Sequence, residues 1–342
     1  MSQLALVYDA DRKQTVQSRP IPEPSNGFVQ VRVEAAAFNP LEYKIYDGYV
    51  PYVEKYPTIL GGDGAGEVTK TGPGVTKFKV GDRVVFMSYF PGSTNLNGEI
   101  GAFQQYALAD VRYTAKIPDS IDYDSASSFP VNGNTVAGDL YGDLKFTAPW
   151  LGGEGAHKGE KIVILGGSSS VGSYTIQFAV LSGLEVITTS SPAHFDYLKS
   201  LGATTVIDRS ASDVAAQILA AAGGPVKYVV DAVSLQSTQL LGVEILQHKG
   251  KLVLLLPTEP SAKTAAEAKD ISLLGGVGPD NFYFSEPIFW ETVGSYMERG
   301  VVKPNRVTVL PGGLHSWEEG FDLHRQGKVS GTKLIMRPQE TK

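Results

Sequence analysis

The spacing of hydrophobic and polar residues predicts a β-rich first part of the chain. Between residues 29 and 35, valine or alanine alternates with a polar residue, as in a half-buried β-strand. Glycine-rich stretches at 61–66 and 72–74 then interrupt the chain, and we expect them to form tight turns between short strands. Another strand is expected at 84–87. We therefore predict a β-rich domain over residues 1–130.

After residue 161 the pattern changes to apolar strands that alternate with helices. A buried strand at 162–165 is followed by a helical pattern through Ile176 and Val180. Further strands are expected at 186–189, 205–207, 228–230, 252–256 and 271–274, with helices at 214–222 and 235–247 and a long connection at 257–269. This alternation predicts an α/β domain with a doubly wound parallel sheet over residues 131–280. We expect residues 281–342 to return to the first domain and to leave a cleft between the two.

Composition narrows the possible functions. The net charge of -6 and the pI of about 5.5 argue against a nucleic-acid partner, which needs a concentrated basic face. The chain has no cysteine, which excludes disulfides, iron–sulfur clusters, thiolate zinc sites and a cysteine nucleophile. The N-terminal residues lack a signal-peptide pattern, and the apolar runs are too short to span a bilayer. We expect a cytoplasmic enzyme or binding protein without a membrane partner.

The strongest motif lies between the first strand and the first helix of the second domain. It consists of Gly166, Gly167, Ser168, Ser169, Ser170, Val171 and Gly172. Such a turn places a pyrophosphate at a helix N-terminus, where free N–H groups and the helix dipole favour negative charge. The spacing departs by one residue from the usual glycine pattern, and Ser169 stands where glycine is frequent. An ordinary strand–helix turn is the alternative interpretation.

The next strand indicates which dinucleotide binds. NAD enzymes usually carry a carboxylate at the end of this strand to bind the ribose 2′-hydroxyl, but here it ends in Ser190 and Ser191. Small hydroxyl residues leave room for a 2′-phosphate. His194 and Arg209 are its expected cationic partners, Arg209 being always charged. The pattern favours NADPH, with a solvated loop position as the alternative for Arg209.

Several stretches resemble the medium-chain dehydrogenase/reductase family. They are PTILGGDGAGEV at 57–68, GVTKFKVGDRV at 74–84, GAFQQY at 101–106, the 166–172 turn, and SLGATTVID at 200–208. The resemblance covers nearly the whole chain in the right order. It implies a GroES-like β-barrel catalytic domain at 1–130 and a Rossmann cofactor domain at 131–280.

The chain departs from the zinc-dependent members of that family. The positions that match the catalytic zinc ligands are Asn39, Gly62 and Val131, none of which binds zinc through its side chain. The motif Asn39-Pro-Leu-Glu-Tyr-Lys44 is instead similar to the zinc-free branch of quinone reductases, 2-enoyl reductases and fungal trans-acting enoyl reductases. The fungal group usually has a lysine and a tyrosine at the positions of Ala193 and Arg209, so the chain differs there too.

The resemblance also implies roles for single residues. Lys44 is the first catalytic candidate, or else it orients the nicotinamide ribose; Tyr49 and Tyr52 loosely resemble an acid tyrosine loop, with packing or exposure as the alternative. Expected cofactor contacts are Asn39, Lys44, Thr135, Leu255, Leu256, Ser330 and Gly331. The aromatic stretch 276–284 is expected to form a pocket wall or part of the core. His157, His248, His315 and His324 lack metal-ligand spacing and are expected at the surface.

These expectations favour an NADPH-dependent reductase of the C=C bond of an α,β-unsaturated carbonyl compound. The substrate would be an enone or an enoyl thioester, and the resemblance to the fungal group implies a polyketide synthase as a partner. NADPH quinone reduction is the alternative among enzymes, and a non-catalytic cofactor-binding protein is the alternative outside them. Relatives occur as homodimers and as monomers, so both states stay open.

Overall fold

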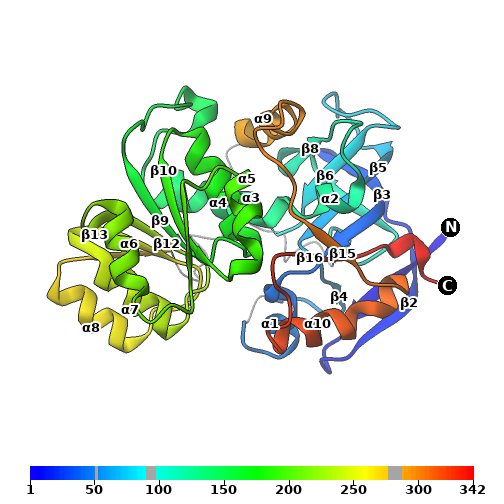
Figure 1. The fold of residues 1–342 in the computed structure, drawn as a ribbon. Helices are drawn as coiled ribbons and strands as arrows, with labels where there is room; N and C mark the ends of the chain where they lie inside the picture. The colour runs from blue at the N-terminus through cyan, green and yellow to red at the C-terminus, as the bar shows by residue number, and fades with distance from the viewer. Residues whose placement is uncertain (51–52, 90–97, 276–286) are drawn as a thin grey trace. The chain divides into compact units, whose positions relative to one another are not determined.

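The computed structural model describes residues 1–50, 53–89, 98–275 and 287–342 (Figure 1). It contains two compact units. Unit 1 comprises Met1–Val131, Glu286–Gly300 and Pro304–Lys342, and unit 2 comprises Asn132–Ser285 and Val301–Lys303. In the part of the chain that the structure describes, no helix is both long and apolar enough to cross a membrane.

Unit 1 is built on β-sheets, as the alternating pattern predicts. Its strands are β1 (Ser2–Tyr8), β2 (Gln14–Pro20), β3 (Phe28–Ala37), β4 (Thr58–Ile59), β5 (Asp63–Thr71), β6 (Arg83–Met87), β7 (Tyr106–Asp110), β8 (Thr114–Lys116), β15 (Val307–Val309) and β16 (Lys333–Met336). A seven-stranded sheet has the order β15-β16-β3-β5-β6-β8, with β7 also on β3, and a second sheet has the order β2-β1-β4. Its helices are α1 (Pro40–Tyr46), α2 (Tyr123–Ser127), α9 (Pro287–Glu298) and α10 (Trp317–Arg325), and α3 (Pro130–Ala137) begins at its boundary. The fully buried Val29, Val31 and Val33 of β3 lie in its core.

Most of the glycine-rich stretch at 61–66, namely residues 63–66, is a strand rather than a turn, which corrects the sequence prediction. Residues from Asp63 onward belong to β5, which pairs with β3 and β6. A Cβ on Gly66 would lie 1.9 Å from the Arg32 carbonyl oxygen, and one on Gly64 would lie 2.3 Å from the Phe86 ring. Glycine therefore serves close packing here, because neighbouring backbone and ring atoms occupy the space of a side chain.

Unit 2 confirms the doubly wound α/β prediction. Its strands are β9 (Lys161–Leu165), β10 (Glu185–Ser190), β11 (Thr205–Asp208), β12 (Val226–Asp231), β13 (Leu246–Leu254) and β14 (Ser272–Gly275). They form one parallel sheet in the order β11-β10-β9-β12-β13-β14. Its helices are α4 (Ser170–Leu181), α5 (Phe195–Ser200), α6 (Val214–Ala222), α7 (Gln236–Ile245) and α8 (Pro260–Ala268). The order reverses at β9, which is where such sheets bind dinucleotides.

Two predictions in unit 2 need correction. The expected connection at 257–269 contains α8, whose alanine-rich sequence is a good helix former and which begins with Pro260 at its first position. The strand expected at 252–256 ends earlier, at Leu254, so Leu255 and Leu256 follow β13 instead of ending it.

Candidate functional site

The 166–172 turn connects β9 to α4 and presents the start of that helix. Ser169 is the N-cap, and its Oγ accepts a hydrogen bond of 3.0 Å from the Gly172 N–H. The first N–H groups of a helix have no partner within the helix, and the one on Val171 has none among the described residues. A phosphate oxygen placed there would meet this donor and the positive end of the helix dipole.

Three glycines of the turn have no room for a side chain. A Cβ on Gly166 would lie 2.3 Å from Cγ2 of Val233, and one on Gly167 would lie 2.2 Å from Oγ1 of Thr188. A Cβ on Gly172 would lie 2.4 Å from the Gly166 carbonyl oxygen. Gly166 also has a positive φ of 78°, which glycine adopts without strain. Because these glycines have no side chains, the turn can pack closely against Val233 and Thr188 and against its own backbone.

The turn is tied to the end of β10. The Gly166 N–H donates to Oγ1 of Thr189 at 3.2 Å, and the Gly167 N–H donates to the Thr189 carbonyl at 3.0 Å. Both donors are therefore used within the protein. Both face β10, whereas an open donor of the turn, the Val171 N–H, lies further along at the start of α4.

The residues expected at the 2′-phosphate meet at the ends of β10 and β11. The Arg209 N–H donates to the Ser190 carbonyl at 3.0 Å, and the Arg209 side chain is exposed. Ser190 is 1% exposed, and its Oγ has no hydrogen-bond partner among the described residues. The Asp208 carboxylate, at the end of β11, accepts hydrogen bonds from the N–H and Oγ of Ser210.

The segment after β10 adds two more of the expected residues. Ser191 precedes a short helical turn, and its carbonyl accepts a 3.1 Å hydrogen bond from the N–H of His194. His194 in turn precedes α5, and both side chains are partly exposed. The structure thus places four of the expected residues at or shortly after the carboxyl ends of β10 and β11: Ser190, Ser191, His194 and Arg209.

Two residues that the sequence analysis missed, Asp231 and Ser234, hold the backbone of Leu255 in place through hydrogen bonds. The Asp231 carboxylate, at the end of β12, accepts from the Ser234 N–H at 2.8 Å, and the Ser234 Oγ accepts from the Leu255 N–H at 2.8 Å. The Leu255 N–H is therefore used within the protein, and the carbonyl is the backbone group of Leu255 that could contact a ligand. The sequence signal for this arrangement was the acid at the end of an apolar strand, because a buried carboxylate needs several hydrogen-bond donors.

The other cofactor candidates are distributed over both units. Thr135 lies in α3, and its side chain is partly buried. Ser330 is exposed and Gly331 has a positive φ of 64°, both in the segment before β16 of unit 1.

Unit 1 contains a buried cluster of charged and polar side chains. Its members Asn39, Glu42, Asp63 and Lys333 are each at most 4% exposed. The Lys333 ammonium donates to Oδ1 of Asn39 and lies 3.3 Å from Oδ2 of Asp63. Nδ2 of Asn39 donates to the same Asp63 oxygen at 2.9 Å. We call these four residues the Lys333 cluster.

The two carboxylates of the cluster also bind backbone N–H groups. Glu42, in the first turn of α1, accepts from the Asn39 N–H at 2.6 Å and from the Gly62 N–H at 3.0 Å. Asp63 accepts from the Val131 N–H at 2.6 Å. Burial raises the pKa of Glu42 to about 7 and raises that of Asp63 as well, although Lys333 opposes the latter shift.

The three positions that match zinc ligands do not fit a zinc ion. A Cβ on Gly62 would lie 2.5 Å from the Tyr89 ring and 2.8 Å from Cγ2 of Val131, so a side chain there would require these two side chains to shift. Val131 is apolar, and both ends of the Asn39 side chain are hydrogen-bonded within the Lys333 cluster. Tetrahedral zinc needs nitrogen, sulfur or carboxylate ligands, which these positions lack.

The catalytic candidates Lys44 and Tyr49 differ in their surroundings. Lys44, on α1, is half-buried, and burial lowers the pKa of its ammonium group. Its carbonyl accepts from the Tyr49 N–H at 2.8 Å, but the Tyr49 side chain is 76% exposed. Tyr52 and the stretch 276–284 lie outside the described residues.

The histidine prediction is correct for two residues and wrong for two. His248 and His315 are exposed. His157 is partly buried between the Thr147 N–H and the Glu160 carboxylate. His324 is stacked on Tyr43, with ring centroids 6.4 Å apart, and burial together with the charge of Lys333 lowers its pKa to about 4.

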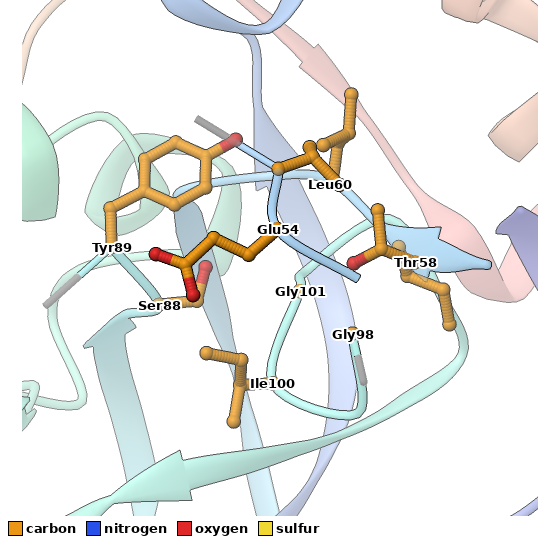
Figure 2. Close-up of a pocket in the computed structure, with 10 residues that line it drawn as sticks. Glu54, Thr58, Leu60, Ser88, Tyr89, Gly98, Ile100 and Gly101 are labelled. Atoms are coloured by element: carbon orange, nitrogen blue, oxygen red, sulfur yellow. The ribbon is translucent and has the colours of Figure 1, made fainter. Parts of the chain in front are cut away.

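Unit 1 also has an open pocket beside β6 (Figure 2). Its lining is formed by Val53, Glu54, Thr58, Ile59, Leu60, Ser88, Tyr89, Gly98, Ile100 and Gly101, around about 350 Å³ of space that includes open solvent. Figure 2 shows the side chains of Glu54, Ser88, Tyr89 and Ile100 around this space. A mainly apolar wall with a few polar groups is typical of a small-molecule site.

Two family models match the chain. Residues 25–119 match the alcohol dehydrogenase GroES-like domain, and residues 170–275 match a domain described as zinc-binding dehydrogenase. The first match lies in unit 1 and the second in unit 2.

Known proteins are similar over almost the whole length. The chain is 34% identical to a trans-enoyl reductase of Aspergillus japonicus, over 90% of this chain and 89% of that protein. It is 30% identical to the enoyl reductase component of lovastatin nonaketide synthase from Aspergillus terreus, over 97% and 94%. A solved alcohol dehydrogenase superfamily protein from Novosphingobium aromaticivorans superposes with a TM-score of 0.80 at 25% identity, over 98% and 99%.

Proposed function

Because the chain belongs to the medium-chain dehydrogenase/reductase family, we propose that it is a zinc-independent, NADPH-dependent reductase of C=C bonds in α,β-unsaturated carbonyl compounds. The observation that carries the proposal is the chemistry of positions 39, 62 and 131: glycine and valine offer no metal ligand, and both ends of the Asn39 side chain are hydrogen-bonded within the Lys333 cluster. Without a Lewis acid, an activated alkene is the substrate best suited to hydride reduction. The two relatives named as enoyl reductases support the same choice.

The preference for NADPH rests on unit 2. The 166–172 turn would hold the pyrophosphate through the N–H groups at the start of α4. Ser190, Ser191, His194 and Arg209 would hold the 2′-phosphate at the ends of β10 and β11, where the Asp208 carboxylate accepts from Ser210. When bound, NADPH supplies the hydride.

Lys44 is the proposed donor in unit 1. Negative charge develops on the carbonyl oxygen as the alkene is reduced, and the α-carbon must receive a proton. A half-buried ammonium group with a lowered pKa can donate to that oxygen. Tyr49 is a second, more exposed donor.

The test is NADPH oxidation with three substrates: a 2-enoyl thioester, a simple enone and a quinone. We expect the thioester or the enone to be turned over, and Lys44→Met to lower kcat by roughly 100-fold, within the range of general acid catalysis. Lys55→Met, at an exposed position of the same unit, is the matched control. Turnover of quinones alone would replace this proposal by quinone reduction, and the absence of any turnover would favour a cofactor-binding protein.

A synthase partner is part of the proposal. One relative is named as the enoyl reductase component of a nonaketide synthase. We therefore expect a carrier-bound enoyl thioester to be reduced with a lower KM than the free thioester.

A further inference from the structure

The Lys333 cluster connects three segments of unit 1 that are far apart in the sequence. Glu42 binds the Asn39 and Gly62 N–H groups, and Asp63 binds the Val131 N–H and the Asn39 side chain. Two carboxylates thus join the segments at residues 39, 62–63 and 131. The Lys333 ammonium contacts both Asp63 and Asn39 in this arrangement.

The charges explain why the lysine is needed. Glu42 and Asp63 are fully buried, and a buried charge without a partner is strongly unfavourable. Within the described residues, Lys333 is the ammonium group that contacts Asp63 and Asn39 directly. His324, on α10, is the nearby titratable group, and its low pKa keeps it neutral beside Lys333 at neutral pH.

The cluster also determines how α1 begins. Asn39 is its N-cap residue, and it is held by Glu42, Asp63 and Lys333 together. Lys44 follows on the same seven-residue helix, so a shift of Asn39 moves Lys44 as well. A misplacement of about 1 Å can lower a rate by roughly 100-fold.

We propose that Lys333 is a positioning residue whose ammonium group, through Asn39 and Asp63, joins the segments at residues 39, 63 and 131 and thereby aligns Lys44. This inference rests on the proposed function in assigning a catalytic role to Lys44. Lys333 itself is buried behind Asn39 and Asp63 and acts through them.

A double-mutant cycle with Lys333→Met and Lys44→Met tests the proposal on the full chain. We expect Lys333→Met to lower kcat about 10-fold or more when Lys44 is present and less than about twofold in the Lys44→Met background. The KM for NADPH should stay within about twofold, because the phosphate turn belongs to unit 2. Lys328→Met, at an exposed position shortly before β16, is the matched control. Independent, multiplying losses of kcat would overturn the inference.

A second variant separates positioning from stability alone. Asp63→Asn combined with Lys333→Met removes one charge of each sign, and we expect its thermal midpoint to recover toward the wild type while kcat stays low. If kcat recovers together with stability, Lys333 has only a structural role. This variant also replaces Lys333→Met in the cycle should the single variant not fold. If Lys44→Met alone leaves kcat unchanged, the assignment of Lys44 as the donor is wrong. The comparison of kcat and thermal midpoint in the Asp63→Asn/Lys333→Met variant then still decides whether Lys333 affects kcat by more than its effect on stability.

Discussion

The phosphate turn of unit 2 and the Lys333 cluster of unit 1 are both binding arrangements, but they are made of different parts. The turn is one continuous segment whose donors are backbone N–H groups, and its glycines keep side chains out. The cluster joins side chains from α1, β5 and β16, and the Lys333 ammonium contacts the buried Asp63 carboxylate. A backbone site is therefore sensitive to added volume, whereas a side-chain cluster is sensitive to a change in charge.

The largest effect should come from the charge of Glu42. Its pKa of about 7 in the folded chain lies above the usual value of 4.5, so the folded state binds its proton more tightly. Its stabilising contribution is full below about pH 4.5 and is lost as the pH rises to about 7, a difference of roughly 3 kcal/mol. Glu42→Gln should remove this component. Urea unfolding between pH 4.5 and 7.5 measures it, and an unchanged pH slope in the variant would contradict the prediction.

Added volume in the turn should have the next largest effect. The obstacle to Gly172→Ala is the Gly166 carbonyl oxygen, a backbone atom that cannot move aside alone. We expect overpacking of about 2–3 kcal/mol to appear as weaker NADPH binding, measured by fluorescence titration. Gly223→Ala, a left-handed helix end with open space around it, is the control for a glycine replacement in unit 2. Equal affinities of both variants would show that the turn does not hold the dinucleotide.

A side chain added at Gly62 in unit 1 should have a smaller effect than one added at Gly172. Gly62→Ala meets the side chains of Tyr89 and Val131, which can shift partly, so we expect a loss of about 1–2 kcal/mol in the free energy of unfolding. NADPH affinity should not change, in contrast to Gly172→Ala. A variant as stable as the wild type would show that position 62 can accept a side chain.

The smallest effect should follow from Arg209. Its guanidinium is exposed and always charged, so Arg209→Gln should weaken NADPH binding about 10-fold, or about 1.4 kcal/mol. Binding of NADH, which lacks the 2′-phosphate, should be unchanged. Equal weakening of both dinucleotides would place Arg209 outside the 2′-phosphate site.

The same contrast explains what the sequence could predict. The turn is contiguous and lies between a clear strand and a clear helix, so its structural context could be inferred from the order of residues. The Lys333 cluster could not, because 294 residues separate Lys333 from Asn39 and an acid on a short helix resembles a surface residue. The glycines at 64 and 66 were misassigned to a turn for a related reason: the atoms that exclude a Cβ belong to β3 and β6, which are distant in sequence.

The position of Lys333 near the end of the chain has a consequence for biosynthesis. The strand β16 that carries it pairs with β3, which emerges from the ribosome much earlier. Until β16 is made, Asp63 lacks its ammonium partner, and β3 lacks its pairing at Ala36 and Ala37. All six strands of unit 2 precede residue 276, so its sheet can form during translation. We therefore expect unit 2 to fold before the sheet of unit 1 is complete.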